Sequence, residues 1–564
     1  MNAEQRQLDA LDVSLVEELV CAQAAEVLGH PVSASDNFFS LGGDSVRAGR
    51  LVMRLTKALH GRGINDMQDV FEAVDFADLS ARIYGRLADA TSAPAPEPSL
   101  PREQAKPLQP QVDDKGRRQI PLTYSQHRRL QRDADSVGQR IAHHVSRSFH
   151  VVGPLDLASL EAACHKLVER HEALRSVFDV DLRNGEHRGY RLSAGDIDCD
   201  RLFRVRQVPV GACVEEQVQA EQGVLFDLPT EVKLRVLVLC TGENTATVVV
   251  TAEHLVCDGD SFTNLVRDLS ALYNSRVGAS GDAVALPDIE PRCWAEEESR
   301  WHQAMLEDRL THWRSRLDPL EALPEVRLSG MRDPEVRPTS AAQCHGHLTA
   351  GTLDRLRKTC AAESTTLFCG FVAALGLAVL ADAGHSVAGM VSPTSGRPEG
   401  WQHDVDWFAT SVINRFRINT ELPVRDVLRS AKQSMAAGLT HSVPLPLLLQ
   451  HLQLNRDLVQ KWRPWLYLAL DTSDSSPMRL HGAHVEPVAA DVQLALRAGL
   501  TIRVEMHPDS GATVLFQYEQ EVWPAARAKE FMGTFTRMVS LVSENPADTD
   551  VATLLRTYQS ASHP

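Results

Sequence analysis

Residues 245–259 read Thr-Ala-Thr-Val-Val-Val-Thr-Ala-Glu-His-Leu-Val-Cys-Asp-Gly, a buried-strand pattern that runs directly into a polar loop. A single histidine at a strand end is more often structural than catalytic. Here His254 is followed at a fixed spacing by Asp258 and Gly259. We expect Gly259 to supply a sharp turn and a cation to hold Asp258, which would keep the loop rigid.

On both sides of this loop the chain alternates between strands and helices. The first segment runs from Ile120 to about Asn274. Its predicted elements are a helix at Leu157–His171, strands at Leu234–Cys240 and Thr245–Ala252, and a helix at Phe262–Ser275. Asp260 or Ser261 can cap the last of these helices. The second segment runs from about Thr311 to the C-terminus, with helices at Gly351–Ser364 and Leu367–Ala381, a strand at Ser386–Ser392 and a hairpin of Leu500–Met506 with Thr513–Tyr518. One final helix is expected after Ala525, followed by a polar tail at Gln559–Pro564. Two α/β lobes of similar size are the simplest interpretation.

A second informative stretch lies near the N-terminus. Residues 36–45 read Asp-Asn-Phe-Phe-Ser-Leu-Gly-Gly-Asp-Ser, and Ser45 stands at the start of a predicted helix over residues 46–59. Gly42 and Gly43 allow a tight turn, and Asp44 or Ser45 can cap the helix. An exposed helix start also favours a bound phosphodiester, because its free N–H groups and positive dipole end point outward. From these residues alone an ordinary capped helix is equally well supported. Further helices are predicted over residues 12–29, 67–73 and 76–87.

The overall numbers exclude several classes of protein. The 564 residues suggest three to four compact units, and the net charge of −16 argues against a nucleic-acid or anionic-membrane surface. No apolar window is long enough to span a membrane, and the polar N-terminal residues lead us to expect no secretory leader. The ten cysteines occur singly, without a Cys-x-x-Cys pair, so we expect neither a metal site nor disulfides, and a cytoplasmic location. Residues 89–118 hold six prolines and are predicted to form an extended tether.

The N-terminal stretch resembles the peptidyl carrier domains of nonribosomal peptide synthetases. The residues that carry the likeness are Phe38 and the run Leu41–Ser45, set among four short helices. The resemblance implies an α-helical carrier domain over residues 10–88. It further implies that 4′-phosphopantetheine esterifies Ser45 and that its terminal thiol holds an acyl group as a thioester.

The body resembles the condensation domains of the same synthetases. Their signature is His-His-x-x-x-Asp-Gly, in which the second histidine, His254 here, matters for catalysis. Other motifs match in the family order, at Leu122, Ser125, Gln126 and Arg128; at Arg170, His171, Glu172, Leu174, Arg175 and Phe178; at Ser392, Pro393 and Arg397; and at His441, Val443 and Pro444. The resemblance implies two chloramphenicol-acetyltransferase-like lobes in a V, residues 119–285 and 286–564, with a tunnel between them. It also implies that Arg397 of the second lobe pairs with Asp258.

The chain departs from the family at several positions. Glu253 replaces the first histidine of the signature, and strand alternation predicts that it faces the interior of the lobe in a structural role. Other departures are Leu130 in place of Trp, Val391 in place of Gly, Phe408-Ala409-Thr410 in place of Phe-Val-Asn, and the survival of Trp294 alone from a longer aromatic motif. The tandem His143-His144 is interpreted as a decoy, because no Asp-Gly follows it.

The resemblance predicts that an amine attacks an acyl or peptidyl thioester held on Ser45, forming an amide at His254. Asp258 and Gly259 would complete the catalytic site, with Glu253 and Arg397 as its structural support. The alternatives are a non-catalytic platform that recruits partner enzymes to the carrier, and an ester-forming or epimerising variant. Expected partners are a phosphopantetheinyl transferase, an adenylation enzyme or upstream module that loads Ser45 in trans, and an acceptor carrier protein or soluble amine. No nucleic acid or membrane is expected to bind.

Overall fold

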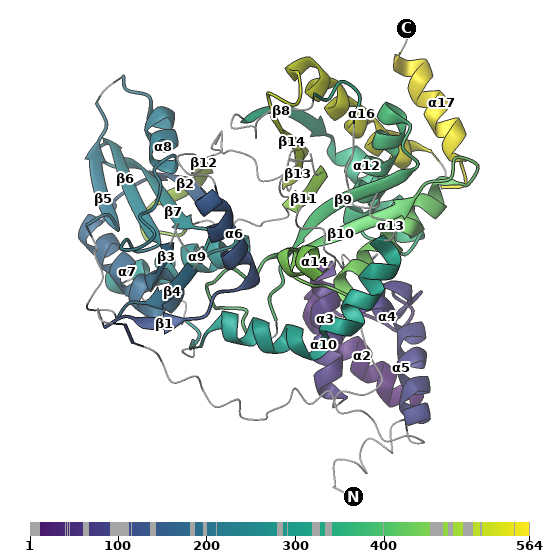
Figure 1. Cartoon of the computed structure of the whole chain (residues 1–564), viewed down its shortest axis with the longest axis horizontal. Helices are drawn as coiled ribbons and strands as arrows, with labels where there is room; N and C mark the ends of the chain where they lie inside the picture. Colours follow the sequence, from purple (N-terminus) through teal and green to yellow (C-terminus); the bar gives the residue numbers. More distant parts are fainter. Residues whose placement is uncertain are drawn as a thin grey trace, which may run out of the picture.

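The computed structural model of the chain contains a small helical unit and two α/β lobes that diverge in a V (Figure 1). The structure describes residues 12–39, 41, 43, 45–59, 67–90, 112–113, 116–135, 143–180, 187–193, 195, 200–209, 211–278, 286–289, 292–317, 328–332, 341–398, 400–451, 466–471, 478–488, 500–507, 510–545 and 547–562. Most of the proline-rich tether predicted at 89–118, together with Gly42 and Asp44, lies outside these residues.

The helical unit is the predicted carrier domain. Its helices are α2 (Val13–Leu28), α3 (Ser45–Ala58), α4 (Met67–Glu72) and α5 (Phe76–Ala90). Asp12 caps α2, because its side chain accepts a hydrogen bond from the N–H of Leu15 at 2.9 Å. The helices enclose a core in which Phe38 packs edge-on against Phe39 and Phe76.

The carrier lies against the second lobe through α4, which packs on helix α13 (Val424–Thr440). Ala436 of α13 is buried in the carrier's own core cluster, and Leu439 packs against that cluster. The Lys432 ammonium lies 6.0 Å from the ring centre of Phe39. Figure 1 shows the carrier in purple beside this helix.

The first lobe is built on a five-stranded sheet in the order β12-β2-β7-β6-β5. Its strands are β2 (His144–Val152), β5 (Phe203–Gln207), β6 (Leu234–Gly242), β7 (Thr245–Glu253) and β12 (His484–Val488). A smaller sheet consists of β1 (Arg118–Ile120), β3 (Ser176–Val180) and β4 (His187–Arg191). The helices of this lobe are α6 (Tyr124–Asp135), α7 (Leu157–Arg170), α8 (Val214–Gln222) and α9 (Gly259–Arg276).

Strand β12 belongs to the second segment of the sequence but completes the first sheet. It runs antiparallel to β2, with His484 opposite Val152 and Val488 opposite Ser148. Met478 and Leu480, just before it, are buried in the first lobe's core. The predicted division at 285/286 therefore does not separate two self-contained lobes.

The second lobe holds a six-stranded sheet in the order β10-β9-β11-β13-β14-β8. Its strands are β8 (Ala341–Leu348), β9 (Val387–Thr394), β10 (Thr410–Arg417), β11 (Leu466–Asp471), β13 (Leu500–His507) and β14 (Gly511–Glu519). Besides α13, its helices are α10 (Trp294–Leu317), α11 (Ala350–Ala362), α12 (Leu367–Ala383), α14 (Leu445–His451), α16 (Ala525–Glu544) and α17 (Val551–Ser562).

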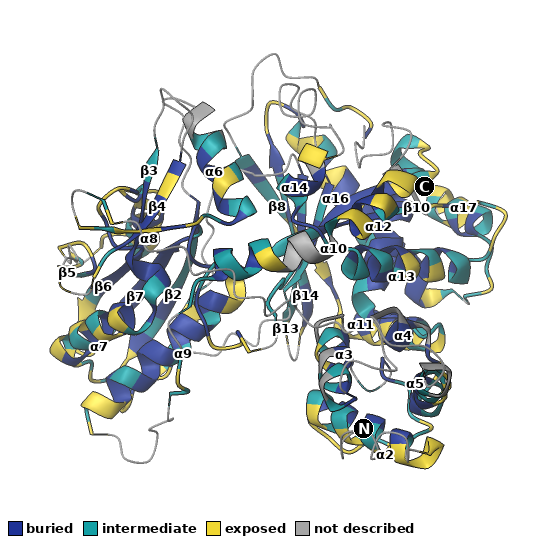
Figure 2. Ribbon diagram, turned by 60° about the horizontal axis from the view of Figure 1, so that its bottom comes forward, coloured by how far each residue is buried: buried dark blue, intermediate teal, exposed yellow. Residues whose placement is uncertain are grey.

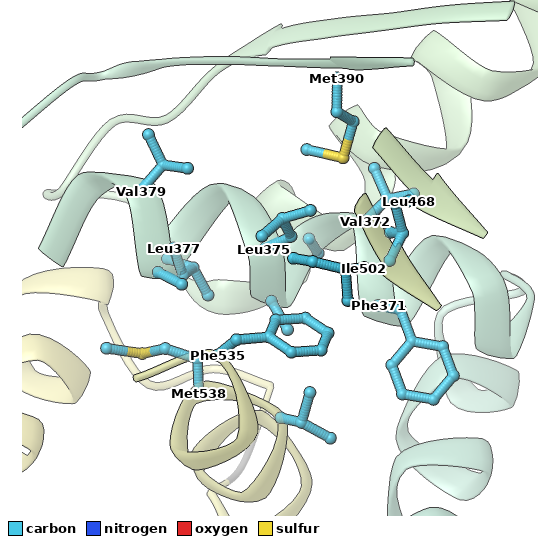
Figure 3. Close-up of a cluster of buried hydrophobic side chains, with 14 of the residues drawn as sticks. Phe371, Val372, Leu375, Leu377, Val379, Met390, Leu468, Ile502, Phe535 and Met538 are labelled. Carbon is cyan, nitrogen blue, oxygen red and sulfur yellow. The ribbon is translucent and has the colours of Figure 1, made fainter. Parts of the chain in front are cut away.

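Helix α12 is the centre of this lobe's core. It is apolar on all sides, which is typical of a buried helix. Thr366 caps its first turn, and Gly384 ends it with a φ of 71°, a conformation that glycine adopts without strain. Phe371, Leu375 and Leu377 of α12 lie among side chains from the sheet and from α16 (Figure 3). Figure 2 shows how buried residues concentrate on the sheets and on the helices that face them.

Two sequence expectations at the C-terminus are wrong. A second terminal helix, α17, follows α16, and residues 559–562 form its last turn rather than a polar tail. Asp550 caps α17 by accepting the N–H of Thr553 at 2.7 Å. Val551 and Leu554 are buried against the lobe. Two apolar residues at helical spacing directly after a capping aspartate are the sequence signal that predicts this helix.

Candidate active site

His254 lies in the turn that follows β7, immediately after the last strand residue. The turn is held from both ends by backbone groups: the N–H of Val256 donates to the carbonyl of Glu253 at 3.1 Å, and that of His254 donates to the carbonyl of His143 at 3.0 Å. Gln126 of α6 donates its side-chain amide to the carbonyl of Leu255 at 2.7 Å. The opening-motif glutamine therefore fixes the histidine loop.

Asp258 joins the two lobes at the end of this loop. One carboxylate oxygen caps α9 by accepting the N–H of Ser261 at 2.8 Å and also contacts the Arg397 guanidinium at 3.2 Å. The other oxygen accepts the backbone N–H groups of Phe408 and Ala409, both at 2.9 Å. Both side chains of the ion pair are almost fully enclosed, at 7% and 2% exposure for Arg397 and Asp258.

Helix α9 begins at Gly259, three residues earlier than expected, and its cap is Asp258 rather than Asp260 or Ser261. Gly259 does not supply the predicted sharp turn by an unusual backbone angle, because its φ is not among the positive ones. A Cβ built at this position would meet no heavy atom within 4 Å. Neither the backbone conformation nor the surrounding atoms therefore require a glycine at position 259.

The His254 ring lies between an aromatic side chain of the second lobe and a second imidazole. Its ring centre is 4.8 Å from that of Trp407, and 4.6 Å from that of His143. Burial lowers the pKa of His254 to about 4. The imidazole is therefore neutral at physiological pH and available as a base or as a hydrogen-bonding group.

Glu253 lies inside the first lobe, on the side of the strand opposite to His254. Its carboxylate oxygens are 3.6 Å from the Arg129 guanidinium and 3.6 Å from Nε2 of His144. Burial raises the pKa of Glu253 to about 7, against the opposing effects of Arg129 and Lys233. Burial likewise lowers the pKa of the Lys233 ammonium to about 7. Glu253 is thus part of a buried charged cluster behind the site.

Sequence reasoning missed two neighbours of His254, namely His143 and Trp407. Trp407 precedes Phe408 and Ala409, the pair whose N–H groups hold Asp258. Phe408 also packs with Trp294 and Trp401, so the surviving tryptophan of the aromatic motif supports the same segment. Neither neighbour carries a motif signal, since each reaches the site through strand pairing or contact between lobes.

Other motif residues lie away from His254. Arg170 and His171 both contact Asp268 of α9, at 2.9 and 3.0 Å, inside the first lobe. His441 stacks on His312 with ring centres 3.7 Å apart. His312 lines a cavity of about 330 Å³ between α10, β10 and α13. These residues support the fold rather than the histidine loop.

In the carrier, Ser45 is the first residue of α3. Two residues before it, the backbone of Gly43 lies so close to Phe38 that a Cβ at this position would be only 2.4 Å from the Phe38 ring. The Gly43 N–H donates to the carbonyl of Phe38 at 2.9 Å, which closes the turn. A serine at the start of a helix, behind a turn that admits no side chain, fits the attachment of a phosphodiester.

No group of three or more His, Cys, Asp or Glu side chains that could hold a metal ion occurs among the described residues. The nine cysteines within those residues are free thiols. In the same part of the chain no single helix is long and apolar enough to cross a membrane; only the bent pair α11 and α12 passes that test together, by length and composition.

Comparison with known proteins identifies both units. The family model described as a condensation domain matches residues 117–560. The chain belongs to the condensation-domain family. The model described as a phosphopantetheine attachment site matches residues 18–83. The protein is thus a carrier domain, of the type that carries 4′-phosphopantetheine, followed by a condensation domain of the nonribosomal peptide synthetase type.

Similar proteins include much longer synthetases. The probable non-canonical nonribosomal peptide synthetase CymA of Salinispora arenicola is 26% identical over 556 residues, which are 93% of this chain and 6% of the relative. Malpinin synthetase of Mortierella alpina is 22% identical over 512 residues, which are 89% of this chain and 6% of the relative. The chain therefore spans only a small part of the length of these relatives.

Solved structures of the same fold cover the body of the chain. The X-domain from teicoplanin biosynthesis has a TM-score of 0.65 at 20% identity, over 77% of this chain and 97% of that one. The first condensation domain of the CDA synthetase has a TM-score of 0.62 at 18% identity, over 77% of this chain and 98% of that one. These likenesses confirm the predicted two-lobed fold.

Proposed function

We propose that the protein forms an amide bond by transferring an acyl or peptidyl group from the carrier to an amine. The observation that carries this proposal is the neutral, half-buried imidazole of His254, which stands in a loop that Asp258 and Arg397 fix between the lobes. The membership in the condensation-domain family and the carrier in front of the body support it.

The attachment site for the carrier's arm is Ser45. When bound, 4′-phosphopantetheine supplies a thiol that presents the acyl group as a thioester. The start of α3 offers its free N–H groups to the phosphodiester, and Gly43 lets the turn close without a side chain in the way. A phosphopantetheinyl transferase must modify Ser45, and an adenylation enzyme or upstream module loads it.

His254 acts on the amine. The reference pKa of an α-amino group is about 7.7–8.0, so a substantial share is already neutral near pH 7.5. As the amine nitrogen bonds to the thioester carbon, the neutral imidazole accepts the proton that the nitrogen loses. His254 would then return that proton to the leaving sulfur as the carbon–sulfur bond breaks, so that the imidazole ends the reaction neutral. Holding the two reactants close together would contribute further.

Asp258, Gly259, Arg397 and Glu253 shape the loop. Asp258 and Arg397 tie the end of the histidine loop to the backbone of the second lobe at Phe408, and a side chain at Gly259 would meet open space. Glu253 stabilises the interior behind the strand end.

The test is a single-turnover transfer assay. Ser45 is loaded with an acyl-pantetheine arm, and discharge is followed by intact mass spectrometry after an aminoacyl carrier or free amine is added. We expect discharge with product formation in the wild type, loss of most product in His254→Ala, and no loading of Ser45→Ala. Transfer in the opposite direction, from a separate acyl carrier onto an amine on Ser45, would make this carrier the acceptor.

A second candidate is the recruiting platform. It is favoured by the fold likeness to the X-domain, which was solved in a complex with OxyB. The same assay separates the two functions, because a platform would leave the discharge rate unchanged in His254→Ala. We place the transfer function first, since a platform gives no reason to keep a neutral histidine in a loop that is fixed from both lobes.

A further inference from the structure

Three arginine side chains meet at the cavity between α10, β10 and α13. The cavity has a volume of about 330 Å³, and Arg316, Arg415 and Arg417 are among the residues that line it. Arg415 and Arg417 lie two positions apart on β10, so their side chains leave the same face of the strand, and Arg316 comes from the last turn of α10. Among the described residues that line the cavity there is no aspartate or glutamate. Positive charge is therefore concentrated here, in a chain whose net charge is −16.

These three arginines lack the carboxylate partners that other arginines of the second lobe have. Arg397 lies 3.2 Å from a carboxylate oxygen of Asp258. Within the described part of the chain, none of the three cavity arginines forms such an ion pair. Burial lowers the pKa of Arg415, and the neighbouring Arg417 and Arg316 lower it further. The three charges repel one another, and an anion between them would relieve this repulsion.

Arg415 has hydrogen-bond donors to spare. Its half-buried guanidinium offers five N–H groups, and Nη1 donates to the carbonyl of Arg316 at the end of α10, at 2.9 Å. Its Nε is enclosed without a partner. Ser434 of α13 fixes the backbone of Arg415, because its hydroxyl accepts the Arg415 N–H at 2.7 Å and donates to the Arg415 carbonyl at 3.1 Å. The bond to α10 therefore explains one nitrogen of a guanidinium that is held in place, and the other donors can bind an anion.

The remaining walls of the cavity are apolar or uncharged. Val387, Ile413 and Trp313 line it, and the ring N–H of Trp313 donates to the carbonyl of His441 at 2.7 Å, which holds the indole in place. Burial lowers the pKa of His312 to about 4, so this histidine is neutral at pH 7. The volume is in the range of sites for small organic molecules. Phosphate is the anion that arginine binds with two parallel hydrogen bonds, and the apolar wall suits an organic group attached to it.

Helix α13 lies between the cavity and the carrier. Ala437 and Gly438 line the cavity, whereas Ala436 and Leu439 pack into the core of the carrier. The phosphopantetheine arm of a carrier is itself a phosphate ester with a partly apolar organic chain. The cavity therefore adjoins the domain that brings this chemistry into the protein.

We propose that the cavity binds a phosphate ester, with the phosphate between the guanidinium groups of Arg316, Arg415 and Arg417 and the organic part on the apolar wall. Two sources supply this chemistry: the phosphodiester of the arm on Ser45, and a free phosphate ester in solution. Binding makes and breaks no covalent bond. It does not depend on the transfer reaction at His254.

The experiment is calorimetric titration of the unmodified full-length protein, which carries no arm, at low salt. The probes are 4′-phosphopantetheine, pantetheine, which differs from it only by the missing phosphate, and inorganic phosphate. The variants are Arg415→Gln and Arg417→Gln; the second replaces an exposed side chain, so we expect it to fold. The matched control is Arg503→Gln, an exposed arginine of β13 in the same sheet that does not line the cavity.

We expect 4′-phosphopantetheine to bind about tenfold or more tightly than pantetheine, and inorganic phosphate to compete with it. Added salt should weaken binding, because the attraction is electrostatic. Arg417→Gln should lower the affinity by about tenfold and the half-buried Arg415→Gln by more, whereas Arg503→Gln should match the wild type. Absence of binding, equal affinity for both pantetheine probes, or wild-type affinity in Arg417→Gln would overturn the proposal, whether or not Arg415→Gln folds.

Two forms of the protein separate the sources of the phosphate. The wild type is given its arm by a phosphopantetheinyl transferase, and Ser45→Ala is treated in the same way. If the arm's own phosphodiester occupies the cavity, added 4′-phosphopantetheine should bind the arm-bearing protein about tenfold more weakly than Ser45→Ala, because the tethered group competes at high effective concentration. Equal affinity in the two forms supports a free phosphate ester as the occupant. A normal discharge rate in His254→Ala would refute the proposed function and leave each of these binding results as it is.

Discussion

Replacing Asp258 by alanine tests how strongly the two lobes are joined at the histidine loop. The change removes the acceptor of four groups: the N–H of Ser261, the guanidinium of Arg397 and two backbone N–H groups of the second lobe. Removing one partner of a buried ion pair typically costs about 3–5 kcal/mol, and each enclosed N–H left without an acceptor adds about 1–3 kcal/mol.

The two partners should not be equally sensitive. Without Asp258, Arg397 still donates to the carbonyls of Trp401 and Asp404, both at 2.7 Å. This places the ion-pair part of the cost near its lower limit of about 3 kcal/mol, and the three enclosed N–H groups, at about 1 kcal/mol each, bring the sum to about 6 kcal/mol. Without Arg397, the carboxylate keeps its three N–H donors, so Arg397→Ala should cost about 3 kcal/mol.

The assay is chemical denaturation of the two single variants and the double variant, followed by tryptophan fluorescence. The double variant should be less damaging than the sum of the single ones by about 0.5–3 kcal/mol. Asp260→Ala is the control, because this neighbouring carboxylate is exposed and bonds Ser395; its effect should stay within about 0.5 kcal/mol. Additive losses, or a larger loss for Arg397→Ala than for Asp258→Ala, would refute the reasoning.

Three further predictions concern other parts of the chain. Coenzyme A and a phosphopantetheinyl transferase should add one arm to the wild type and none to Ser45→Ala by intact mass; an arm on the variant would contradict the assignment. Burial raises the pKa of Glu253 to about 7, so the wild type loses stability as the pH rises from about 4.5 through 7. From pH 5 to pH 8 the free energy of unfolding of Glu253→Gln, measured by chemical denaturation, should therefore rise relative to that of the wild type by at most about 3 kcal/mol. A difference between the two proteins that does not change with pH would show that the Glu253 carboxyl does not titrate with a raised pKa. Ala436→Arg should place a charge in the carrier's core contact and detach the carrier from α13, seen as a larger radius of gyration in X-ray scattering, whereas the exposed Gln433→Arg should change nothing.

The sequence predicts an element correctly where the residues that specify it lie within the element or next to it. The apolar run at 367–381 predicted α12, and the strand at 245–252 predicted β7 to within one residue. Ser45 was placed at a helix start, and the structure begins α3 at that residue. In each case periodicity or a cap lies within a few positions of the element it specifies.

The rest depended on contacts between distant segments. His143 reaches His254 only because β2 and β7 pair in one register, and a tandem histidine does not encode a register. Trp407 reaches the site from the other lobe. The same limit explains why β12 was not assigned to the first sheet, since a strand of only 5 residues gives no sign of its partner.

The exchange of β12 between the lobes decides how the protein can be divided. A fragment that ends at residue 285 would lose the strand that covers one edge of β2, together with Met478 and Leu480 from its core. An uncovered edge pairs readily with other chains, so such a fragment should aggregate. Engineers who exchange parts of this body should therefore move residues 478–488 with the first lobe, or supply them as a separate peptide that completes the sheet.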